Sequence, residues 1–297
     1  MNFGLVLSFC NKRWTDPVEL ADLCASLSID KVQFSWDLVD PLWEHSVRDK
    51  IARGYSEAFK SSGISLTTCF SGMSAYAYPN LLAEDPLVRQ MGVYLVEQAI
   101  DMCSVMEIPE IGMALGCMSD RQARDPQGRY LQYVQLKEEL IKLCAYARKE
   151  GVQRFSVEPT PVYSEIPNSA AESLRLMEEL NGQTEIPVQL MLDVGHILCP
   201  PFNSEPANIL YWLDVCGTYV RAIHLQQCDG KMDRHWGFDT EGIVRAEDVV
   251  SIAAHPTMHG KTQYLECCPA FETPNEQVLK QISTSLAWLR ENCKFDR

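Results

Sequence analysis

The sequence lacks a long uninterrupted run of apolar residues. None of its apolar runs approaches the ~20 residues that a membrane-spanning helix needs. The first five residues, Met1 to Leu5, contain no basic stretch ahead of an apolar one, which argues against a signal peptide. We therefore expect a cytoplasmic protein without a membrane partner.

Positive charge is also scarce. The chain has 26 Lys and Arg against 40 Asp and Glu, giving a formal net charge of −14. Nucleic-acid-binding proteins concentrate Lys and Arg to neutralise phosphates, so a polyanion would be repelled over most of this surface. The composition argues against a nucleic-acid partner, but a local basic pocket can still hold a small anion.

Cysteine is present, but in no pattern typical of disulfides or metal binding. The 12 cysteines are scattered, and Cys103, Cys144 and Cys216 fall in apolar stretches. Because no secretory signal is evident, we expect reduced and mostly buried thiols. Cys267 and Cys268 are adjacent and so cannot form a CxxC motif.

The 297 residues contain no low-complexity segment or linker that would divide them, which predicts one domain over residues 1–297. Short β-like runs alternate with amphipathic helical patterns. The expected strands are Gly4–Ser8, Lys31–Ser35, Ser65–Phe70, Ile108–Ala114, Phe155–Glu158, Val188–Asp193, Val220–Leu225 and Gln263–Cys267. The expected helices are Pro17–Leu27, with Asp16 as its N-cap, Val47–Ser61, Pro86–Met106, Tyr130–Lys149, Ser169–Leu180, Ala207–Cys216, Arg245–Ala254 and Asn275–Glu291.

Eight strand–helix alternations predict an α/β fold, a single (β/α)8 TIM barrel. A doubly wound open sheet is the alternative. No GxGxxG follows the first expected strand to support a dinucleotide-binding sheet.

Four consecutive expected strands end in residues that can bind a metal: Glu158, Asp193, His224 and Glu266. Each is separated from the next by one strand–helix unit. A TIM barrel gathers the carboxyl ends of its strands at one rim, so the four side chains are expected to converge there. A single strand-end Glu is usually a solvated loop residue, but four in register are hard to obtain by chance. Three oxygen donors and one nitrogen suit one divalent ion, Mn²⁺, Mg²⁺ or Co²⁺, with Zn²⁺ also compatible.

The pattern Glu158-Pro, Asp193-Val-Gly-His196, Ile-His224 and Leu-Glu266 resembles the xylose-isomerase-like TIM barrels, and within them the sugar phosphate isomerases and ketose 3-epimerases. The strand-7 loop from Gln226 to Trp236 and the segment from Glu266 to Glu272 look similar to members that process tetrulose phosphates. The resemblance implies one divalent metal on the four strand-end residues. It also implies that His196 and an arginine of the strand-7 loop bind substrate, and Arg234 matches that arginine best.

The resemblance predicts isomerisation or epimerisation of a small ketose or ketose phosphate. Both reactions remove a proton next to a carbonyl, and a bound metal acts there as a Lewis acid. Glu158 and Glu266 come from different strands and could serve opposite faces of a planar cis-enediolate, one removing and one returning the proton. His196 and Arg234 would stabilise the enediolate oxygen.

Other residues near the expected site have weaker signals. Glu165 could touch substrate, although a loop carboxylate near a helix start is the more ordinary interpretation. Lys231, Arg234 and His235 form a local basic cluster that suits a phosphate, although an exposed loop lysine is the default. The aromatic residues near strand ends could wall a sugar pocket or simply pack: Trp14, Trp36, Phe70 and Trp236.

Three alternatives remain open. Asp233 and His235 supply an Asp-x-His as in multi-zinc apurinic-site endonucleases, but the strand-2 and strand-3 ends, around Asp37 and Gly72, lack the histidines for further metals. A polyol dehydratase would share the proton abstraction. A metal-stabilised binding protein would need no catalysis, yet both candidate acids are present. Barrels of this kind commonly pair, so a homodimer is one arrangement that the sequence leaves open.

Overall fold

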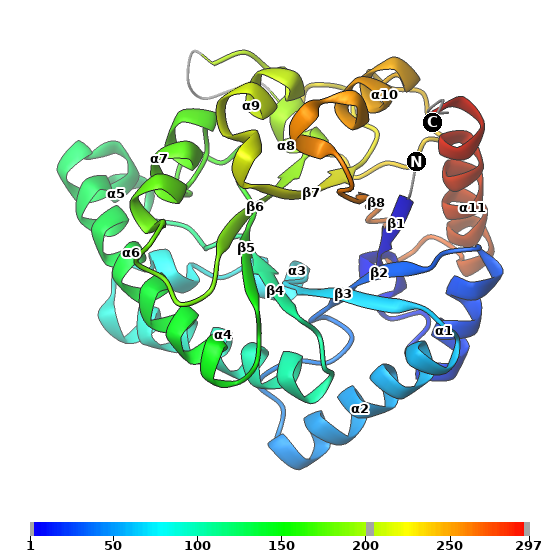
Figure 1. Ribbon diagram of the computed structural model, residues 1–297, viewed down its shortest axis with the longest axis horizontal. Helices are drawn as coiled ribbons and strands as arrows, with labels where there is room; N and C mark the ends of the chain where they lie inside the picture. Colours follow the sequence, from blue (N-terminus) through cyan, green and yellow to red (C-terminus); the bar gives the residue numbers. More distant parts are fainter. Residues whose placement is uncertain (1–2, 200–204, 294–297) are drawn as a thin grey trace.

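The computed structural model describes residues 3–199 and 205–293. Its eight strands are all parallel and hydrogen-bonded in sequence order, and β8 pairs with β1 to close the barrel. Down the barrel axis, the strands form a central ring and the helices surround it (Figure 1). The predicted (β/α)8 TIM barrel is confirmed. Residues 1–2 and 294–297, the ends of the predicted domain, lie outside the described residues.

The strands are short and mostly buried, as expected for a sheet covered by helices on its outer face. Their bounds are β1 Phe3–Val6, β2 Lys31–Ser35, β3 Ser65–Phe70, β4 Glu110–Met113, β5 Arg154–Val157, β6 Val188–Asp193, β7 Val220–Leu225 and β8 Gln263–Leu265.

Helix starts follow the capping signals in the sequence. Asp16, Asp85 and Asp125 each accept hydrogen bonds from first-turn N–H groups, and a proline follows each of them. The α-helices are α1 Pro17–Ser26, α2 His45–Ser61, α3 Met73–Tyr76, α4 Pro86–Val105, α5 Asp120–Arg124, α6 Pro126–Lys149, α7 Ala170–Leu180, α8 Val194–Leu198, α9 Ile209–Cys216, α10 Ala246–Ala254 and α11 Asn275–Asn292. Single 3-10 turns lie at Leu7–Cys10, Asn80–Leu82, Gly217–Tyr219 and Pro256–Met258.

The differences from the expected elements concern their ends. Glu158 and Glu266 lie one residue beyond β5 and β8, and the first expected strand stops at Val6 because the chain turns into a 3-10 helix. Helix α6 begins at Pro126 rather than at the expected Tyr130 because Asp125 caps it. Three short helices in the loops after strands, α3, α5 and α8, have too few residues to produce a helical periodicity in the sequence.

Apolar side chains fill the barrel on both sides of the sheet. Inside the ring, a small buried cluster consists of Val6, Phe70, Met191, Ala222 and Tyr264. A larger core lies between the strands and the helices. Gly4 makes room for the inner cluster, because a Cβ there would lie 2.3 Å from the Tyr264 ring.

A buried ion cluster occupies the amino-terminal end of the barrel. The fully buried carboxylate of Glu110 accepts hydrogen bonds from Arg221 Nε at 3.0 Å and Ser156 Oγ at 2.5 Å. Arg154 Nε lies 3.4 Å from the same carboxylate. The strand starts are thereby tied together at the end opposite the predicted metal ligands.

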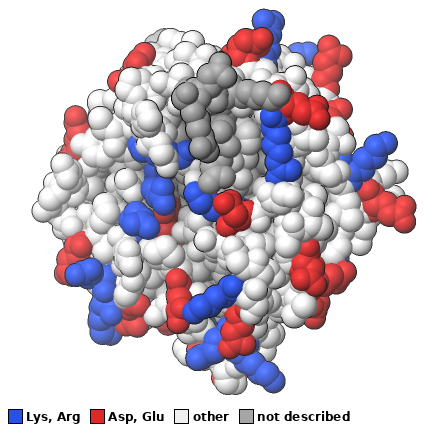
Figure 2. Space-filling view, turned by 45° about the vertical axis from the view of Figure 1, so that its right-hand side comes forward, with Lys and Arg blue, Asp and Glu red and all other residues white. Residues whose placement is uncertain are grey.

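Charged groups of both signs mix on the surface. Figure 2 shows Lys and Arg interspersed with Asp and Glu on the face in view. Among the described residues, no helix is long and apolar enough to cross a membrane.

Candidate active site

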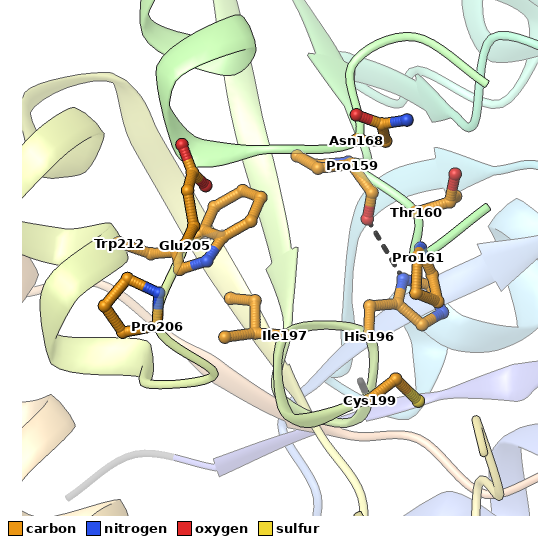
Figure 3. Close-up of a pocket in the computed structure, with 10 residues that line it drawn as sticks. All are labelled: Pro159, Thr160, Pro161, Asn168, His196, Ile197, Cys199, Glu205, Pro206 and Trp212. Atoms are coloured by element: carbon orange, nitrogen blue, oxygen red, sulfur yellow. Dashed lines mark hydrogen bonds between the residues drawn. The ribbon is translucent and has the colours of Figure 1, made fainter. Parts of the chain in front are cut away.

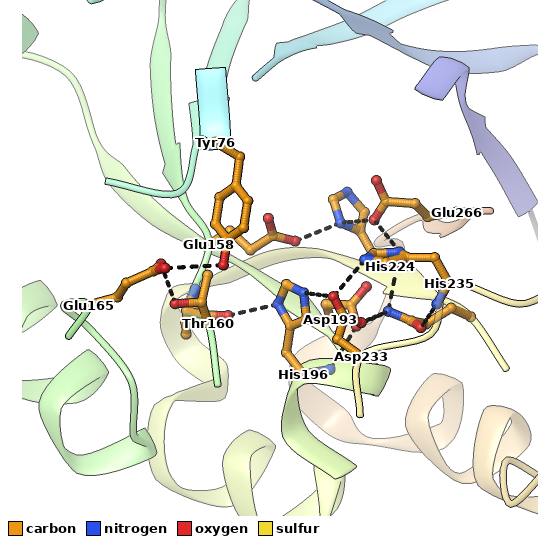
Figure 4. A network of polar contacts seen from close by, with 12 residues as sticks. Tyr76, Glu158, Thr160, Glu165, Asp193, His196, His224, Asp233, His235 and Glu266 are labelled. Carbon is orange, nitrogen blue, oxygen red and sulfur yellow. Dashed lines mark hydrogen bonds and ion pairs between the residues drawn. The ribbon is translucent and has the colours of Figure 1, made fainter. Parts of the chain in front are cut away.

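Four predicted ligands meet at the carboxyl ends of adjacent strands. Glu158 directly follows β5, Asp193 ends β6, His224 lies near the end of β7, and Glu266 directly follows β8. One ligand atom from each lies within 4.8 Å of all the others, and all four residues are buried. The barrel therefore gathers three carboxylates and one imidazole into a single enclosed cluster, the strand-end cluster, which Figure 4 shows with its neighbours.

His224 is held in a defined orientation. Its Nε2 lies 2.7 Å from Gln33 Oε1, a carbonyl oxygen that can only accept, so Nε2 carries a proton. Its Nδ1 lies 2.8 Å from Glu158 Oε1 and 2.9 Å from Glu266 Oε2. The ring edge of Phe70 packs against the imidazole, with centroids 5.2 Å apart. A nitrogen facing two carboxylate oxygens requires a positive charge between them, supplied by a proton or a metal ion.

The electrostatics of the cluster agree with that geometry. Burial opposes the charged form of His224, but Glu266 and Glu158 outweigh it and raise the pKa of the imidazole well above its ordinary value. Burial likewise favours the neutral form of Glu266, yet His224 and His235 lower the pKa of this carboxyl to about 2. Excess negative charge in a buried space is the condition under which a divalent cation binds.

Asp193 provides the clearest sign that a cation fits. Its Oδ1 accepts hydrogen bonds from Gln226 Nε2 at 2.8 Å and from the His196 backbone N–H at 2.9 Å. Its Oδ2 is buried and has no hydrogen-bond partner within the described part of the chain. A buried carboxylate oxygen without a partner is costly, and a metal held by the strand-end cluster would satisfy it. The donor set, three carboxylates and an imidazole, suits Mn²⁺, Mg²⁺ or Co²⁺, and Zn²⁺ is compatible.

A second polar group adjoins the cluster and contains His196, Asp233 and His235. Asp233 Oδ2 lies 3.2 Å from His196 Nε2 and 2.8 Å from His235 Nε2. The Nδ1 of His196 contacts the Pro159 carbonyl oxygen at 3.1 Å. Gln226 joins the two groups, because its Nε2 donates to both Asp193 and Asp233. These three residues could also hold a cation.

Protonation couples the members of this second group. Burial disfavours the charged form of His235, but its hydrogen bond to Asp233 and the charge of Glu266 raise its pKa to about 9. The two histidines conversely hold the pKa of Asp233 far below its ordinary range, although burial opposes this. Two positively charged imidazoles, whose Nε2 atoms face Asp233, therefore lie beside the strand-end cluster near neutral pH.

Glu165 lies on another side of the site. Its buried carboxylate accepts hydrogen bonds from Thr160 Oγ1 at 2.6 Å and from Tyr76 Oη at 3.1 Å. Burial raises the pKa of this carboxyl, in spite of those two hydrogen bonds. The structure thus places Glu165 in the polar network of Figure 4 rather than on an open loop.

Arg234 and Lys231 lie further out in the loop after β7. Asp229 Oδ2 accepts hydrogen bonds from Arg234 Nε at 3.1 Å and Nη2 at 2.8 Å, and the guanidinium lies 5.2 Å from the Trp236 ring centroid. Lys231 is exposed. Within the described ranges, neither residue makes a hydrogen bond or ion pair to the strand-end cluster.

A narrow pocket borders the same region (Figure 3). His196 and Thr160 line it and also belong to the network of Figure 4. Cys199 and Trp212 contribute part of the wall. Of the aromatic candidates, Trp14, Trp36 and Phe70 are almost fully buried, whereas Trp236 is partly exposed.

Sequence reasoning missed several residues of the site. Gln33 lies in the middle of β2, and its only signal is a polar residue between the apolar Val32 and Phe34. Gln226 follows β7 directly, at the rim where functional residues gather, so its position could have indicated it. Tyr76 ends the four-residue helix α3 and Thr160 lies in a loop, so no periodicity marks either of them.

Gln33 provides a test of the cluster. Replacing it with Leu removes the acceptor that fixes the His224 ring, and losses of this kind weaken metal binding about 10–100-fold. Titration calorimetry of the metal-free protein with Mn²⁺ measures the change. Gln132→Leu, at a buried glutamine of α6 outside the site, is the matched control. An unchanged Kd in the Gln33 variant would show that this residue does not orient a ligand.

Comparisons with known proteins agree with the geometry. A family model described as a xylose isomerase-like TIM barrel matches residues 21–292. A candidate xylose isomerase of Rhodospirillum rubrum ATCC 11170 has a crystal structure that is similar with a TM-score of 0.95 and 36% identity, covering 98% of this chain and 99% of that one.

Two more distant relatives are named as epimerases. D-erythrulose 1-phosphate 3-epimerase of Brucella abortus (strain 2308) is 21% identical over 295 residues, covering 93% of this chain and 91% of the relative. D-psicose 3-epimerase of Clostridium cellulolyticum H10 shares the fold, with a TM-score of 0.75 and 16% identity over 99% of this chain and 100% of that one. The predicted family resemblance is confirmed, and so is the expectation of an enzyme: the chain belongs to the xylose isomerase-like TIM barrel family.

Proposed function

We propose that this enzyme is a metal-dependent epimerase of a small ketose phosphate. The observation that carries the proposal is that the Glu158 and Glu266 carboxylates reach the same nitrogen of His224 from two sides (Figure 4), with the unpartnered Asp193 oxygen buried nearby. Inversion at a carbon next to a carbonyl needs a base on one face and an acid on the other. Two carboxylates from β5 and β8 meet that need.

The residues of this chain would divide the work as follows. Glu158, Asp193, His224 and Glu266 would hold the divalent ion. When bound, that ion supplies Lewis-acid polarisation of the substrate carbonyl and hydroxyl oxygens. One of Glu158 and Glu266 removes the proton from the α-carbon, and the other returns one to the opposite face. The positive charge of the two imidazoles in the His196–Asp233–His235 group would stabilise the oxygen on which negative charge develops.

The names of the relatives support this choice of reaction. The relative from Brucella abortus is named as a 3-epimerase of a tetrulose phosphate, and structural neighbours are named as 3-epimerases of free ketoses. Both groups invert a carbon beside a ketone, which is the chemistry that paired carboxylates allow.

Solvent exchange tests the proposal directly. The enzyme would be incubated in D₂O with Mn²⁺ or Mg²⁺ and a panel of C4–C6 ketoses and their phosphates, and proton NMR would follow the α-carbon. Deuterium should appear at the epimerised carbon of at least one substrate, together with its epimer. Absence of exchange across the panel, with a metal bound, would contradict the proposal.

The substrate phosphate is expected to contact Arg234. Asp229 occupies the Nε and Nη2 edge of the guanidinium and holds it in place, and Nη1 has no hydrogen-bond partner among the described residues. The planar guanidinium suits phosphate oxygens, and Lys231 and His235 add positive charge in the same loop.

Arg234→Ala should therefore lower kcat/KM selectively for the phosphorylated ketose. A lost charge-assisted contact costs about 1.5–3 kcal/mol, and the free ketose is the internal control. Lys231→Ala is compared in parallel, because it removes one positive charge from the same loop and leaves the guanidinium of Arg234 in place. Equal losses for both substrates would place Arg234 at the reacting end and remove the main support for a phosphate.

A second candidate, a multi-zinc phosphodiesterase, has one observation in its favour: the His196–Asp233–His235 group beside the strand-end cluster. The structure also weakens it, because Asp37 at the end of β2 is engaged by Asn11 and by the start of α3 rather than free to bind metal. Cleavage of an abasic-site oligonucleotide would favour this candidate. A polyol dehydratase would instead release a product that has lost water.

A further inference from the structure

Hydrogen bonds to the carboxylate of Asp37 hold the short helix α3 over the barrel end. Asp37 accepts hydrogen bonds from the backbone N–H groups of Met73 at 2.8 Å and Ser74 at 3.1 Å, and from Ser74 Oγ at 2.5 Å. Asn11 Nδ2 donates to the same carboxylate at 2.7 Å. Gly72 permits this approach, since a Cβ there would lie 2.2 Å from Asp37 Cγ. In the view down the axis, α3 lies within the ring of strands (Figure 1).

Tyr76 is the last residue of α3, and its hydroxyl reaches the site. Tyr76 Oη donates to Glu165 Oε1 at 3.1 Å, while Thr160 Oγ1 donates to Oε2. Burial and then the charges of Glu165, Glu158 and Asp233 raise the pKa of Tyr76 far above its ordinary value, so the hydroxyl stays a donor. Tyr76 is nevertheless 45% exposed, so its contact with Glu165 is only partly buried.

We infer that Tyr76 is a positioning residue that orients the Glu165 carboxylate as an acceptor for a substrate hydroxyl. The inference rests on the proposed function. Because Thr160 and Tyr76 each engage one carboxylate oxygen, the plane of the Glu165 carboxylate is fixed while each oxygen keeps acceptor capacity. An oriented acceptor binds a hydroxyl with less loss of freedom than a mobile one.

The charge of this subsite determines which end of the substrate it takes. The Glu165 carboxylate accepts hydrogen bonds from two hydroxyls and, among the described residues, from no basic side chain. Arg129 donates to the Glu165 backbone oxygen and pairs with Glu172, and the charges of His196 and Glu158 act on the carboxylate in opposite directions, so a phosphate finds no unpaired guanidinium there. Strand β3, which leads to α3, lies across the closed barrel from β7, whose loop bears Arg234. The ketose phosphate is therefore oriented with its phosphate toward the β7 loop and its far hydroxyl toward Glu165 and Tyr76.

Tyr76→Phe tests this inference, because it removes the hydroxyl and keeps the ring. Tyr78→Phe is the matched control, as Tyr78 lies two residues away and is 63% exposed. With the ketose phosphate that shows exchange, KM should rise about 3- to 10-fold in the Tyr76 variant with kcat little changed, the size expected for one hydrogen bond made equally in the ground and transition states. The control variant should match the parent protein.

Two further measurements separate positioning from a general structural effect. The parent protein should prefer the ketose phosphate over an analogue lacking the far hydroxyl, and Tyr76→Phe should reduce that preference. In a Glu165→Ala background, the Tyr76 substitution should have no additional effect on KM. Equal KM values for parent and Tyr76→Phe, or additive effects of the two substitutions, would overturn the inference. Absence of exchange in the parent protein would instead contradict the proposed function.

Discussion

Replacing Glu266 with Gln should remove nearly all proton exchange at the α-carbon of the substrate while the barrel remains folded. The substitution keeps the size of the side chain and leaves one oxygen atom near His224 that can coordinate a metal. It eliminates, however, a group that can accept and return a proton. General acid–base catalysis of this kind contributes about 10²–10⁴-fold. Deuterium exchange into the ketose, followed by NMR, measures the loss without requiring that the product be separated.

Glu158→Gln should have the same effect, because its carboxylate faces the other side of the His224 nitrogen. Glu272→Gln is the matched control, since Glu272 is an exposed carboxylate in the segment after β8. Circular dichroism and thermal melting would verify that each variant is folded. Parent-level exchange in either site variant would show that its carboxylate is neither the acid nor the base.

Chelation of the divalent ion should abolish activity, and adding Mn²⁺, Mg²⁺ or Co²⁺ should restore it. The cluster places three carboxylates around a single imidazole in a buried space, an arrangement that a cation neutralises. Metal binding should also raise the melting temperature, because at 100 times Kd it stabilises the folded state by about 2.7 kcal/mol. Elemental analysis should find about one ion per chain if the strand-end cluster alone is filled.

His224→Ala should remove both the metal-dependent activity and the metal-dependent stabilisation. His255→Ala is its control, because His255 pairs with Asp214 away from the site. Full activity in the chelated parent protein would contradict the metal prediction. Several ions per chain would favour the multi-zinc alternative.

The sequence predicted the barrel because its signals are local. Alternation of short apolar runs with capped amphipathic segments depends on neighbouring residues, and Asp16-Pro17 marks a helix start wherever the helix later packs. Strand ends were less predictable. Glu158 and Glu266 each lie one residue beyond their strands, although their backbone N–H groups still donate to Met113 and Leu225 of the neighbouring strands.

Convergence of the four strand-end residues followed from the topology, but their supporting contacts did not. Gln33 and His224 are 191 residues apart, and the pairing of their side chains depends on how β2 and β7 face each other inside the ring. Asp229 and Asp233 both lie in the loop that bears Arg234. The structure separates them, because Asp229 bonds Arg234 and Asp233 bonds the two histidines.

The two ends of the barrel differ in how their buried charges are balanced. At the amino-terminal end, Glu110 meets the guanidinium groups of Arg154 and Arg221, so that end is compensated by the chain itself. At the carboxyl end, the strand-end cluster contains no guanidinium, and the divalent ion that we propose would supply the balancing charge. Changes near Glu110 should therefore alter how much folded protein accumulates, whereas ion supply should determine how much of that protein is active. Abundance and activity would then be governed from opposite ends of one barrel.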